Sequence, residues 1–568
     1  MKIELCDKRK SILAEAGHLL VTGGPGSGKT TIALLKAQRT IAALRPGQQV
    51  LFLSFSRAAV RQVMVRCKSI LSHNERQMIE VQTYHSFCLE LLKSHGRLLA
   101  GHIPRIIYPD AERLEAADFD GDWEAECARR AKEDTTLLFS QFAAAAAQLL
   151  EDCNAVRALV ATKYPLIIVD EFQDTDDDQW RLVAALSKSA TVFCLADPDQ
   201  SIFQYEPKVD PQRIEKAIAF LKPKVVDLAG ENHRSPNSGI LAFADAVLKN
   251  KALPKAPEVA QYIYQVNAFD SVVHAAVLWM IAQLRKAGIS DPTVAVLCRS
   301  NGLVAEISAI LSEKRPYKTT MLPSLEHDVL WDAELSAAAA AVLASILEWK
   351  DDTHNAALAR TLKFIAAYYR LKNATEPSNS AKDTARKFSE ASAAAATGGK
   401  LKIKAAKELE ALLKAGAAVF VGDPVVDWKA AQKIMAQVSA LAEIGRQVRL
   451  VRLFRATDAL GRGLAELWLA AGNYRTATIL IKRILDQEKL ISLEQDPRGC
   501  LLMNIHKSKG KEFDGVVLVE GAFKSFFFDE KNEKAPYPQS RRLLRVALTR
   551  ARSRTAIIRW AKARALVG

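Results

Sequence analysis

The sequence predicts an α/β protein built on parallel sheets, and two stretches carry this prediction. In the first, an apolar segment, "HLLVTG" (18–23), precedes a glycine-rich turn and then "TTIALLKAQRTIAAL" (30–44), whose apolar residues have helical spacing. In the second, the continuous apolar run 166–169 is typical of a strand buried on both faces of a parallel sheet. At 568 residues the chain is too long for one hydrophobic core, so several domains are expected.

The turn between that first strand and helix is a candidate phosphate site. "TGGPGSGKTT" (22–31) has the GxxxxGK[ST] spacing of a P-loop, and its flanks disfavour a ligand-free turn. Glycines let backbone N–H groups surround phosphate oxygens, and the helix N-terminus adds partial positive charge. Lys29 is expected to reach the outer phosphates and the Thr30 hydroxyl to bind Mg²⁺. The predicted nucleotide-binding residues are Gly23, Gly24, Pro25, Gly26, Ser27, Gly28, Lys29, Thr30 and Thr31.

Two carboxylates follow the second predicted strand directly. In "YPLIIVDEFQDTDDDQW" (164–180), Asp170 and Glu171 come at the strand's carboxyl end, where ligands bind in open α/β sheets. Asp170 is expected to hold Mg²⁺, and Glu171 to orient and deprotonate the attacking water. An apolar run followed by Asp-Glu is common in proteins. It indicates a nucleotide site here because the same sequence also contains a P-loop.

Composition narrows the class of partner. Lys and Arg total 79 against 64 Asp and Glu, and the net charge of +15 favours a polyanionic partner. The 8 cysteines form no CxxC pair, which argues against a zinc site or disulfide scaffold and for a cytoplasmic, reducing location. The polar start "MKIELCDKRK" is no signal peptide, and the longest apolar runs, such as 335–347, are too short to span a membrane.

Eight ordered segments resemble the motifs of the UvrD/Rep/PcrA group of superfamily 1 helicases. The acidic segment "DEFQDT" (170–175) resembles motif II of that group. The other matching segments are "LFLSFSRAAV" (51–60), "QTYHSF" (82–87), "LADPDQSIFQY" (195–205), "ENHRS" (231–235), "VLCRSN" (296–301), "LMNIHKSKGKEFDGVVLV" (502–519) and "RRLLRVALTRAR" (541–552). The middle of the chain, about 345–495, matches none of the group's motifs.

The resemblance implies a fold of two RecA-like P-loop domains with parallel sheets, each with a mainly helical insertion, and ATP in the cleft between them. The segment 375–400 mixes Pro, Ser, Asn and a Gly pair, so we expect a linker or loose connection there. The expected divisions are 1–87 and 163–265 for the first domain, 88–162 for its insertion, 266–345 and 497–568 for the second domain, and 346–496 for its reduced insertion.

The resemblance also assigns roles in ATP hydrolysis and DNA binding. Arg234 and Arg550 would place positive charge against the γ-phosphate, and Gln200 would sense that phosphate. Glu512 would reach toward the nucleotide sugar. Aromatic rings would stack on exposed bases, each worth roughly 1–3 kcal/mol. The DNA-binding residues predicted in this way are Phe55, Arg57, Thr83, His85, Phe203, Tyr205 and His506.

Some positions depart from the group's pattern. No glutamine stands near Lys8 and Arg9, where the group carries one for the adenine. His233 replaces a base-stacking tyrosine, and Thr31 replaces an arginine that often follows the P-loop threonine. Motif VI usually carries a tyrosine where Arg545 stands. These changes leave the phosphate chemistry intact but put selectivity for adenine in doubt.

The function expected from the resemblance is ATP- and Mg²⁺-dependent movement on single-stranded DNA, 3′ to 5′, with unwinding at duplex junctions. An alternative is a DNA-stimulated ATPase subunit that regulates a partner nuclease of the OLD family, as in antiphage systems such as Gabija. A third is an RNA-directed ATPase. A small-molecule P-loop kinase would explain neither Arg550 nor the segment 502–513. Oligomeric state and the choice between DNA repair and antiviral defence stay open.

Overall fold

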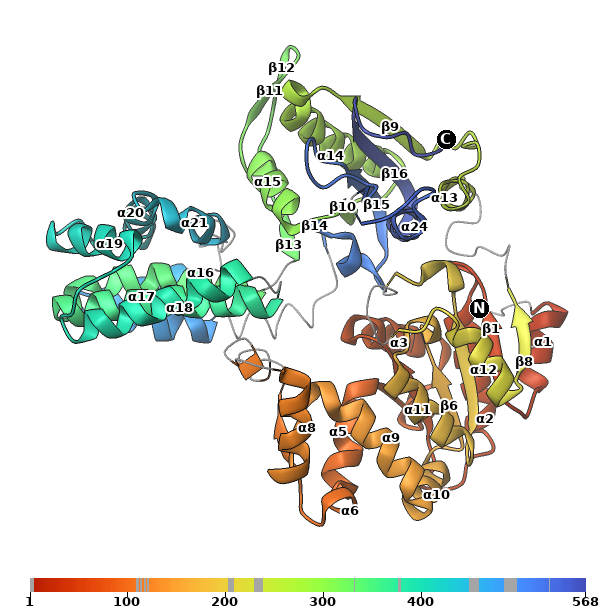
Figure 1. Cartoon of the computed structure of the whole chain (residues 1–568). Helices are drawn as coiled ribbons and strands as arrows, with labels where there is room; N and C mark the ends of the chain where they lie inside the picture. The colour runs from red at the N-terminus through yellow and green to blue at the C-terminus, as the bar shows by residue number, and fades with distance from the viewer. Residues whose placement is uncertain are drawn as a thin grey trace. The chain divides into compact units, whose positions relative to one another are not determined.

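The structure, a computed structural model, divides into two compact units. One comprises Met1–Ile107, Cys127–Val329 and Pro497–Gly568, and the other comprises Tyr108–Glu126 and Leu330–Asp496. The first unit holds two six-stranded sheets, and the second is mainly helical (Figure 1). The described residues are 5–108, 112, 115–116, 119, 122–202, 209–228, 239–330, 333–375, 379–448, 459–484, 498–530 and 532–568.

The first sheet has the strand order β3-β2-β6-β7-β1-β8, and all its neighbouring strands pair in parallel. Alternate strand residues enter two separate hydrophobic clusters; Leu19 and Val21 go to one, and Leu20 to the other. Both faces are therefore buried, as the continuous apolar runs predict. The strands are β1 (Leu19–Thr22), β2 (Val50–Ser54), β3 (Ile79–Thr83), β6 (Leu166–Val169), β7 (Thr191–Ala196) and β8 (Lys224–Asp227).

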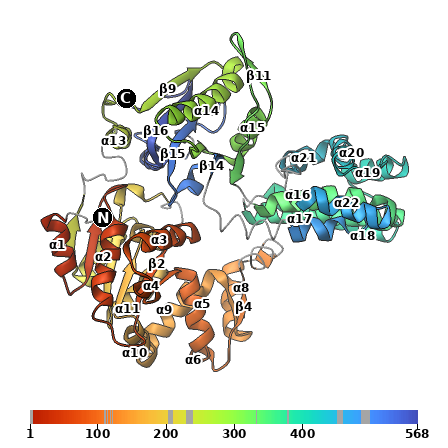
Figure 2. The same ribbon diagram turned by 180° about the vertical axis from the view of Figure 1, so that it is seen from behind.

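Helices cover both faces of this sheet. One face packs against α1 (Asp7–Ala14), α2 (Lys29–Ile41) and α3 (Arg57–Ile70), which are visible in Figure 2. The other packs against α5 (Tyr84–His95), α9 (Phe142–Asp152), α10 (Asn154–Lys163), α11 (Asp177–Ser187) and α12 (Arg213–Leu221). The remaining elements here are α4 (His73–Gln77), α6 (Arg97–Ala100), β4 (Arg105–Ile107), α8 (Trp123–Glu133) and β5 (Thr136–Leu138).

The segment 88–162, predicted as an insertion, contributes directly to the core of the first sheet. Ala146, Leu149 and Leu150 of α9 are buried in the same cluster as strand residues of that sheet. The alanine-rich sequence, interpreted as a separate helical part, is apolar because this helix lies against the sheet. The structure of residues 88–162 therefore differs from the predicted division, which placed them outside the first domain.

The second sheet has the order β13-β14-β10-β15-β16-β9, and the five strands from β14 to β9 pair in parallel. Residues 259–264 pair with β16 here, although the predicted boundary at 265 assigned them to the first domain. The strands are β9 (Val259–Tyr264), β10 (Val294–Cys298), β13 (Asp328–Leu330), β14 (Cys500–Asn504), β15 (Phe513–Val519) and β16 (Ala551–Trp560). The helices are α13 (Ile240–Leu248), α14 (Phe269–Lys286), α15 (Asn301–Ser312) and α24 (Pro538–Leu548), and β11 (Arg315–Tyr317) pairs with β12 (Thr320–Leu322).

One described helix is long and apolar enough to cross a membrane by length and composition alone. It comprises Val266–Lys286, 21 residues with a mean hydropathy of 1.2, and a helix packed in a hydrophobic core can meet the same criteria. Within α14, Val273, Val277 and Met280 are buried in the cluster that includes strands β10 and β15. The helix is apolar because that side packs on the second sheet.

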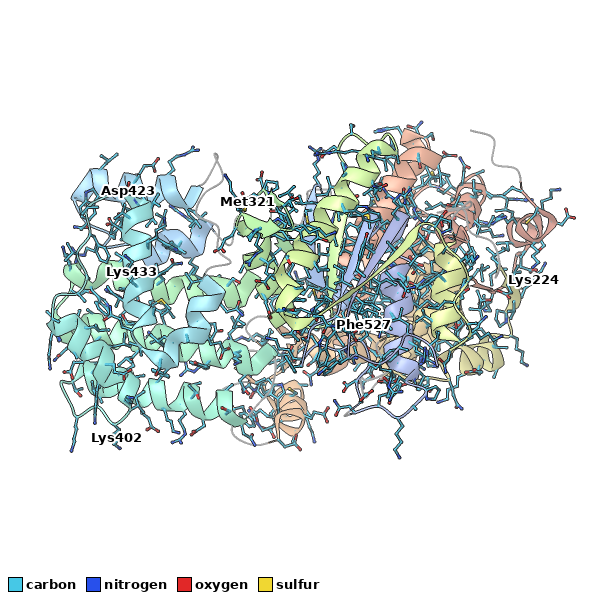
Figure 3. The ribbon with its side chains drawn as sticks, turned by 90° about the horizontal axis from the view of Figure 1, so that it is seen from above. Lys224, Met321, Lys402, Asp423, Lys433 and Phe527 are labelled. Atoms are coloured by element: carbon cyan, nitrogen blue, oxygen red, sulfur yellow. The ribbon has the colours of Figure 1, made fainter. Side chains whose placement is uncertain are left out.

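The helical unit has one hydrophobic core. Asp423 accepts hydrogen bonds from Val425 N and Val426 N at the start of α20, and Lys433 lies in the last turn of that helix, so both charges complement the helix dipole (Figure 3). The helices are α16 (Ala333–Leu347), α17 (His354–Thr375), α18 (Asn379–Ala396), α19 (Lys404–Lys414), α20 (Pro424–Ala436), α21 (Ala442–Val448) and α22 (Ala459–Ala471).

The segment predicted as a linker, 375–400, instead contains the whole of a regular helix, α18. Ala385, Phe388 and Ala395 of α18 are buried, at the spacing of one helical face. Ser389 and Ser392 lie within this helix, and the Gly pair follows it, where glycine favours turns. The interior is alanine-rich and helix-forming, so the linker prediction was wrong.

A buried carboxylate fixes the loop before α20. Asp427 accepts hydrogen bonds from Val421 N and Gly422 N, both at 2.8 Å, and from the Tyr474 hydroxyl at 2.7 Å. Gly422 has a φ of +89°, and a Cβ built on it would lie 2.1 Å from Nε1 of Trp468. The rigid indole leaves no room for a side chain at this position.

We predict that Gly422→Ala lowers the free energy of unfolding of the helical unit by about 2–4 kcal/mol, because left-handed strain and overpacking add. Gly416 is the matched control, since its φ is +65° and a Cβ there meets nothing within 4 Å. Gly416→Ala should cost only about 1 kcal/mol. Urea unfolding followed by circular dichroism measures both; equal losses would contradict the steric argument.

Candidate functional site

The P-loop connects β1 to α2 at the carboxyl edge of the first sheet. Gly26 and Gly28 have φ values of +77° and +83°, a conformation that side chains disfavour. A Cβ on Gly23 would lie 2.6 Å from Oγ of Ser27, so a side chain there would displace the serine hydroxyl. Ser27 Oγ is buried with no hydrogen-bond partner among the described residues, as expected of a group that faces a ligand.

The P-loop lysine contacts its own loop. Lys29 Nζ donates to the carbonyl oxygens of Gly23 at 2.5 Å and Gly24 at 3.2 Å. It also lies 4.0 Å from Oδ2 of Asp197, which follows β7. The ammonium is therefore held at the mouth of the glycine turn, where phosphates are predicted to bind.

The two predicted carboxylates follow β6 at the same edge. Burial and the neighbouring Glu171 raise the pKa of Asp170 to about 7. Burial also acts to raise the pKa of Glu171, but the cations Lys509 and Lys29 outweigh it, and the net pKa is lowered. Near pH 7 the pair thus combines an ionised glutamate with an aspartate that is partly protonated.

Two predicted residues, far apart in sequence, contact each other beside these carboxylates. Arg550, which lies between α24 and β16, donates from Nη2 to Oε1 of Gln200 at 2.8 Å across 350 residues of sequence. Gln200 Nε2 in turn donates to Oδ2 of Asp197 at 2.6 Å. Arg550 is only 3% exposed and also donates to Val546 O at 3.0 Å. A guanidinium carried by the second sheet is thus linked to the motif beside Lys29.

Lys509 is a residue of the site that the sequence analysis did not single out. Its Nζ donates to Asp174 Oδ2 and, at 3.0 Å, to Gln200 O, and it lies 3.8 Å from Glu171 Oε2. Burial raises the pKa of Asp174 to about 7, although Lys509 acts against this rise. The signal was present, because Lys509 is part of the predicted motif "HKSKGKEF" and Asp174 of "DEFQDT".

Other predicted nucleotide contacts have different surroundings. Glu512 pairs with Arg66 at 3.1 Å and with Arg552 at 3.4 Å, so its role at the sugar stays a prediction. Arg9, where the sequence offers no glutamine, donates to Ser27 O at 3.0 Å and so supports the P-loop backbone. The residues Pro25, Thr30 and Thr31 lie in the P-loop and the first turn of α2, and His233 and Arg234 lie outside the described residues.

The predicted DNA contacts that the structure describes lie mainly beyond β2 and β3. Ser54 and Thr83 are register partners at the carboxyl ends of those strands, and Phe55, which follows, is 36% exposed. Thr83 caps α5 by accepting from Ser86 N at 3.2 Å, and the ring of His85 stacks on Phe139 at 4.2 Å. His506 lies in a turn after β14. Phe203, Tyr205 and the Arg57 side chain lie outside the described residues.

Comparison with known families decides the assignment. Residues 6–124 and 109–217 match the UvrD/REP helicase N-terminal domain, and residues 369–562 match the UvrD-like helicase C-terminal domain. The chain belongs to the UvrD/Rep/PcrA-like helicases of superfamily 1. The predicted family and the α/β class with two RecA-like domains are confirmed, and this UvrD-like helicase is an ATP hydrolase by family.

The chain covers a different share of the length of each protein to which it is similar. The chain is 24% identical to YjcD of Bacillus subtilis (strain 168), named as an ATP-dependent DNA helicase, over 96% of this chain and 77% of that protein. It is 22% identical to ATP-dependent DNA helicase Rep of Buchnera aphidicola subsp. Baizongia pistaciae (strain Bp), covering 55% of this chain and 54% of Rep. For ATP-dependent DNA helicase PcrA of Staphylococcus aureus (strain Mu50 / ATCC 700699), identity is 23% and the coverage is 43% and 40%. The chain thus spans about half the length of Rep, and less of PcrA.

A solved structure, the Pif1 helicase from Candida albicans, matches with 12% identity and a TM-score of 0.24, over 48% of this chain and 54% of that chain. At this TM-score the likeness adds nothing to the assignment, which rests on the family domains and the sequence relatives.

We predict that Lys509→Met destabilises the helicase by about 3 kcal/mol or more, because Asp174 then lies buried without its cation. Asp174 is ionised above its pKa of about 7 and neutral below it, so the loss should shrink as the pH falls from 8 to 6. Thermal unfolding of the variant and of the wild-type chain at pH 8 and at pH 6 measures this loss of stability. The double variant Lys509→Met with Asp174→Asn should recover much of the loss, and an unchanged loss would contradict the ion-pair argument.

Proposed function

We propose that this helicase is an ATP-driven translocase that moves 3′ to 5′ on single-stranded DNA and separates strands at duplex junctions. The observation that supports it best is the bond between Arg550 and Gln200, because it links a cation of the second sheet to the P-loop edge of the first. Hydrolysis that requires groups from both sheets can drive movement of one sheet relative to the other. Translocation requires such movement.

The residues at the P-loop edge divide the work of hydrolysis. On nucleotide binding, the Lys29 ammonium would donate hydrogen bonds to phosphate oxygens in place of the carbonyl oxygens of the P-loop. Glu171, whose pKa is lowered, is ionised at neutral pH and so can accept a proton from the attacking water. Arg550 would supply fixed positive charge as negative charge develops on the terminal phosphate, an effect worth on the order of 10³-fold or more in rate.

The residues present also fit a magnesium ion. Within the described ranges no group of three or more His, Cys, Asp or Glu side chains gathers as a metal site. Mg²⁺ commonly takes one or two carboxylates and completes its shell with phosphate oxygens and water, so Asp170 with the Thr30 hydroxyl is a suitable protein contribution. When bound, the ion would neutralise charge on the phosphate oxygens.

The DNA side follows from the strand order. In the sheet, β2 lies between β6 and β3, so the strand before Asp170 adjoins the strand before Phe55, and the strand that ends at Thr83 is the next one along. A shift at the nucleotide edge could therefore reach the proposed DNA contacts through neighbouring strand ends. Thr83 would bind the DNA backbone, and the partly exposed ring of Phe55 would stack on a base.

Strand displacement tests the proposal directly. We predict that the purified chain displaces a strand from a duplex with a 3′ single-stranded tail, and not from one with a 5′ tail. Lys29→Ala should lose hydrolysis and displacement while binding of single-stranded DNA is retained, because the lysine lies in the P-loop and is not one of the proposed DNA contacts. Fluorescence of the released strand gives the rate, and Lys363→Ala in the helical unit serves as a matched lysine control.

Other outcomes would replace this proposal with a different function. Hydrolysis stimulated by single-stranded DNA without displacement of either duplex would favour an ATPase subunit that regulates a partner nuclease. Stimulation by RNA alone would favour an RNA-directed ATPase. Hydrolysis retained in Lys29→Ala would contradict the role given to the P-loop.

The raised pKa of Asp170 predicts a pH dependence of Mg²⁺ binding. Below its pKa of about 7 the carboxyl must lose a proton before it can bind the ion, so the Mg²⁺ concentration for half-maximal nucleotide binding should rise about tenfold from pH 8 to pH 6. A fluorescent ATP analogue titrated with Mg²⁺ measures this. Asp170→Asn isolates the protonation of the nucleotide itself, and an equal pH effect in this variant would contradict the prediction.

A further inference from the structure

Arg545 is a buried cation of the second sheet's helix α24 that the hydrolysis described above does not use. Its side chain is 3% exposed, and its Nε donates to Oδ1 of Asp245, on the neighbouring helix α13, at 2.7 Å. That single bond anchors one edge of the guanidinium. A buried arginine normally satisfies its remaining donors as well, because unsatisfied buried charge is costly.

The other edge of the guanidinium lacks such bonds. Nη1 lies 3.7 Å from Asp197 Oδ1 and Nη2 lies 3.6 Å from Asp199 Oδ2, both beyond hydrogen-bond distance. Nη1 is buried without a hydrogen-bond partner among the residues that the structure describes. Asp197 and Asp199 thus place negative charge near this edge of the guanidinium without accepting hydrogen bonds from it.

This edge faces the P-loop. Nη2 is 3.5 Å from the position of a Cβ built on Gly24, so the guanidinium lies beside the glycine turn. Asp197, one of the two carboxylates at this edge, is also the residue 4.0 Å from Lys29 Nζ. Two cations, one from each sheet, therefore share one aspartate at the predicted phosphate site.

A phosphate group would satisfy what this edge lacks. Arginine presents planar paired donors that match phosphate oxygens, and it keeps its charge. Burial acts to lower the pKa of Arg545, but the carboxylates of Asp197, Asp245 and Asp199 outweigh it and raise that pKa. Aspartates at this distance balance the charge while the terminal donors stay open to a stronger acceptor.

We propose that Arg545 is a further phosphate-binding residue of the nucleotide site, which positions the ATP phosphates from the second sheet through Nη1 and Nη2. This inference rests on the proposed function, because it assumes that a nucleotide occupies the P-loop. On binding, phosphate oxygens take the terminal donors of Arg545 while Asp245 keeps Nε in place. Asp197 then loses both of its nearby cations to the nucleotide, and binding links the two sheets.

Nucleotide binding by Arg545→Met and Arg545→Lys tests the inference, with fluorescent analogues of ATP, ADP and AMP as probes. Loss of charge-assisted hydrogen bonds should weaken ATP binding by Arg545→Met about tenfold or more, with a much smaller effect on AMP. Arg545→Lys should recover part of the affinity, because a point charge replaces paired donors. Arg564→Met is the matched control, since Arg564 is 44% exposed and pairs with Glu530.

The outcomes separate this inference from the function on which it rests. If the wild-type chain hydrolyses ATP and Arg545→Met binds ATP as tightly as wild type, the inference fails and the proposed function stands. If all three nucleotides weaken equally and the thermal midpoint falls, Arg545 is only a structural ion-pair partner. If the wild-type chain binds no nucleotide, the proposed function itself fails.

Discussion

The site depends on buried cations of the second sheet whose acceptors belong to the first. Arg550 and Lys509 both donate to Gln200, one to its side chain and one to its backbone, and Lys509 also reaches Asp174. A charge that is removed from water must find acceptors where it is buried. Both cations thus take acceptors from the first sheet, and these contacts hold Gln200 and Asp174 next to the second sheet.

Sequence reasoning succeeded where chemistry is local. The backbone of the P-loop is left-handed at Gly26 and Gly28, a conformation that favours glycine. This requirement can be recognised in a short segment of sequence. Asp170 and Glu171 were predictable because a strand with two buried faces can present polar groups only beyond its end. The contact between Gln200 and Arg550 became predictable through the motif resemblance, since nothing local in either segment requires the other.

The missed features depend on how distant elements pack. Arg9, Lys509 and Arg545 act through partners that are fixed only when the helices and sheets assemble, and no spacing rule reveals such pairs. In the fold, the Pro, Ser, Asn and Gly content of 375–400 suggested a linker where α18 stands, and the alanines of α9 suggested an insertion. Composition describes which backbone conformations are allowed, and it does not describe which surface a helix will cover.

The lysine of the P-loop also braces the turn in which it stands. Lys29 donates hydrogen bonds to the carbonyl oxygens of Gly23 and Gly24. In the proposed function the ammonium would exchange these acceptors for phosphate oxygens, so part of its attraction to the nucleotide would be offset and the affinity moderated. Because the turn itself offers acceptors, release of product would not leave this cation without hydrogen bonds.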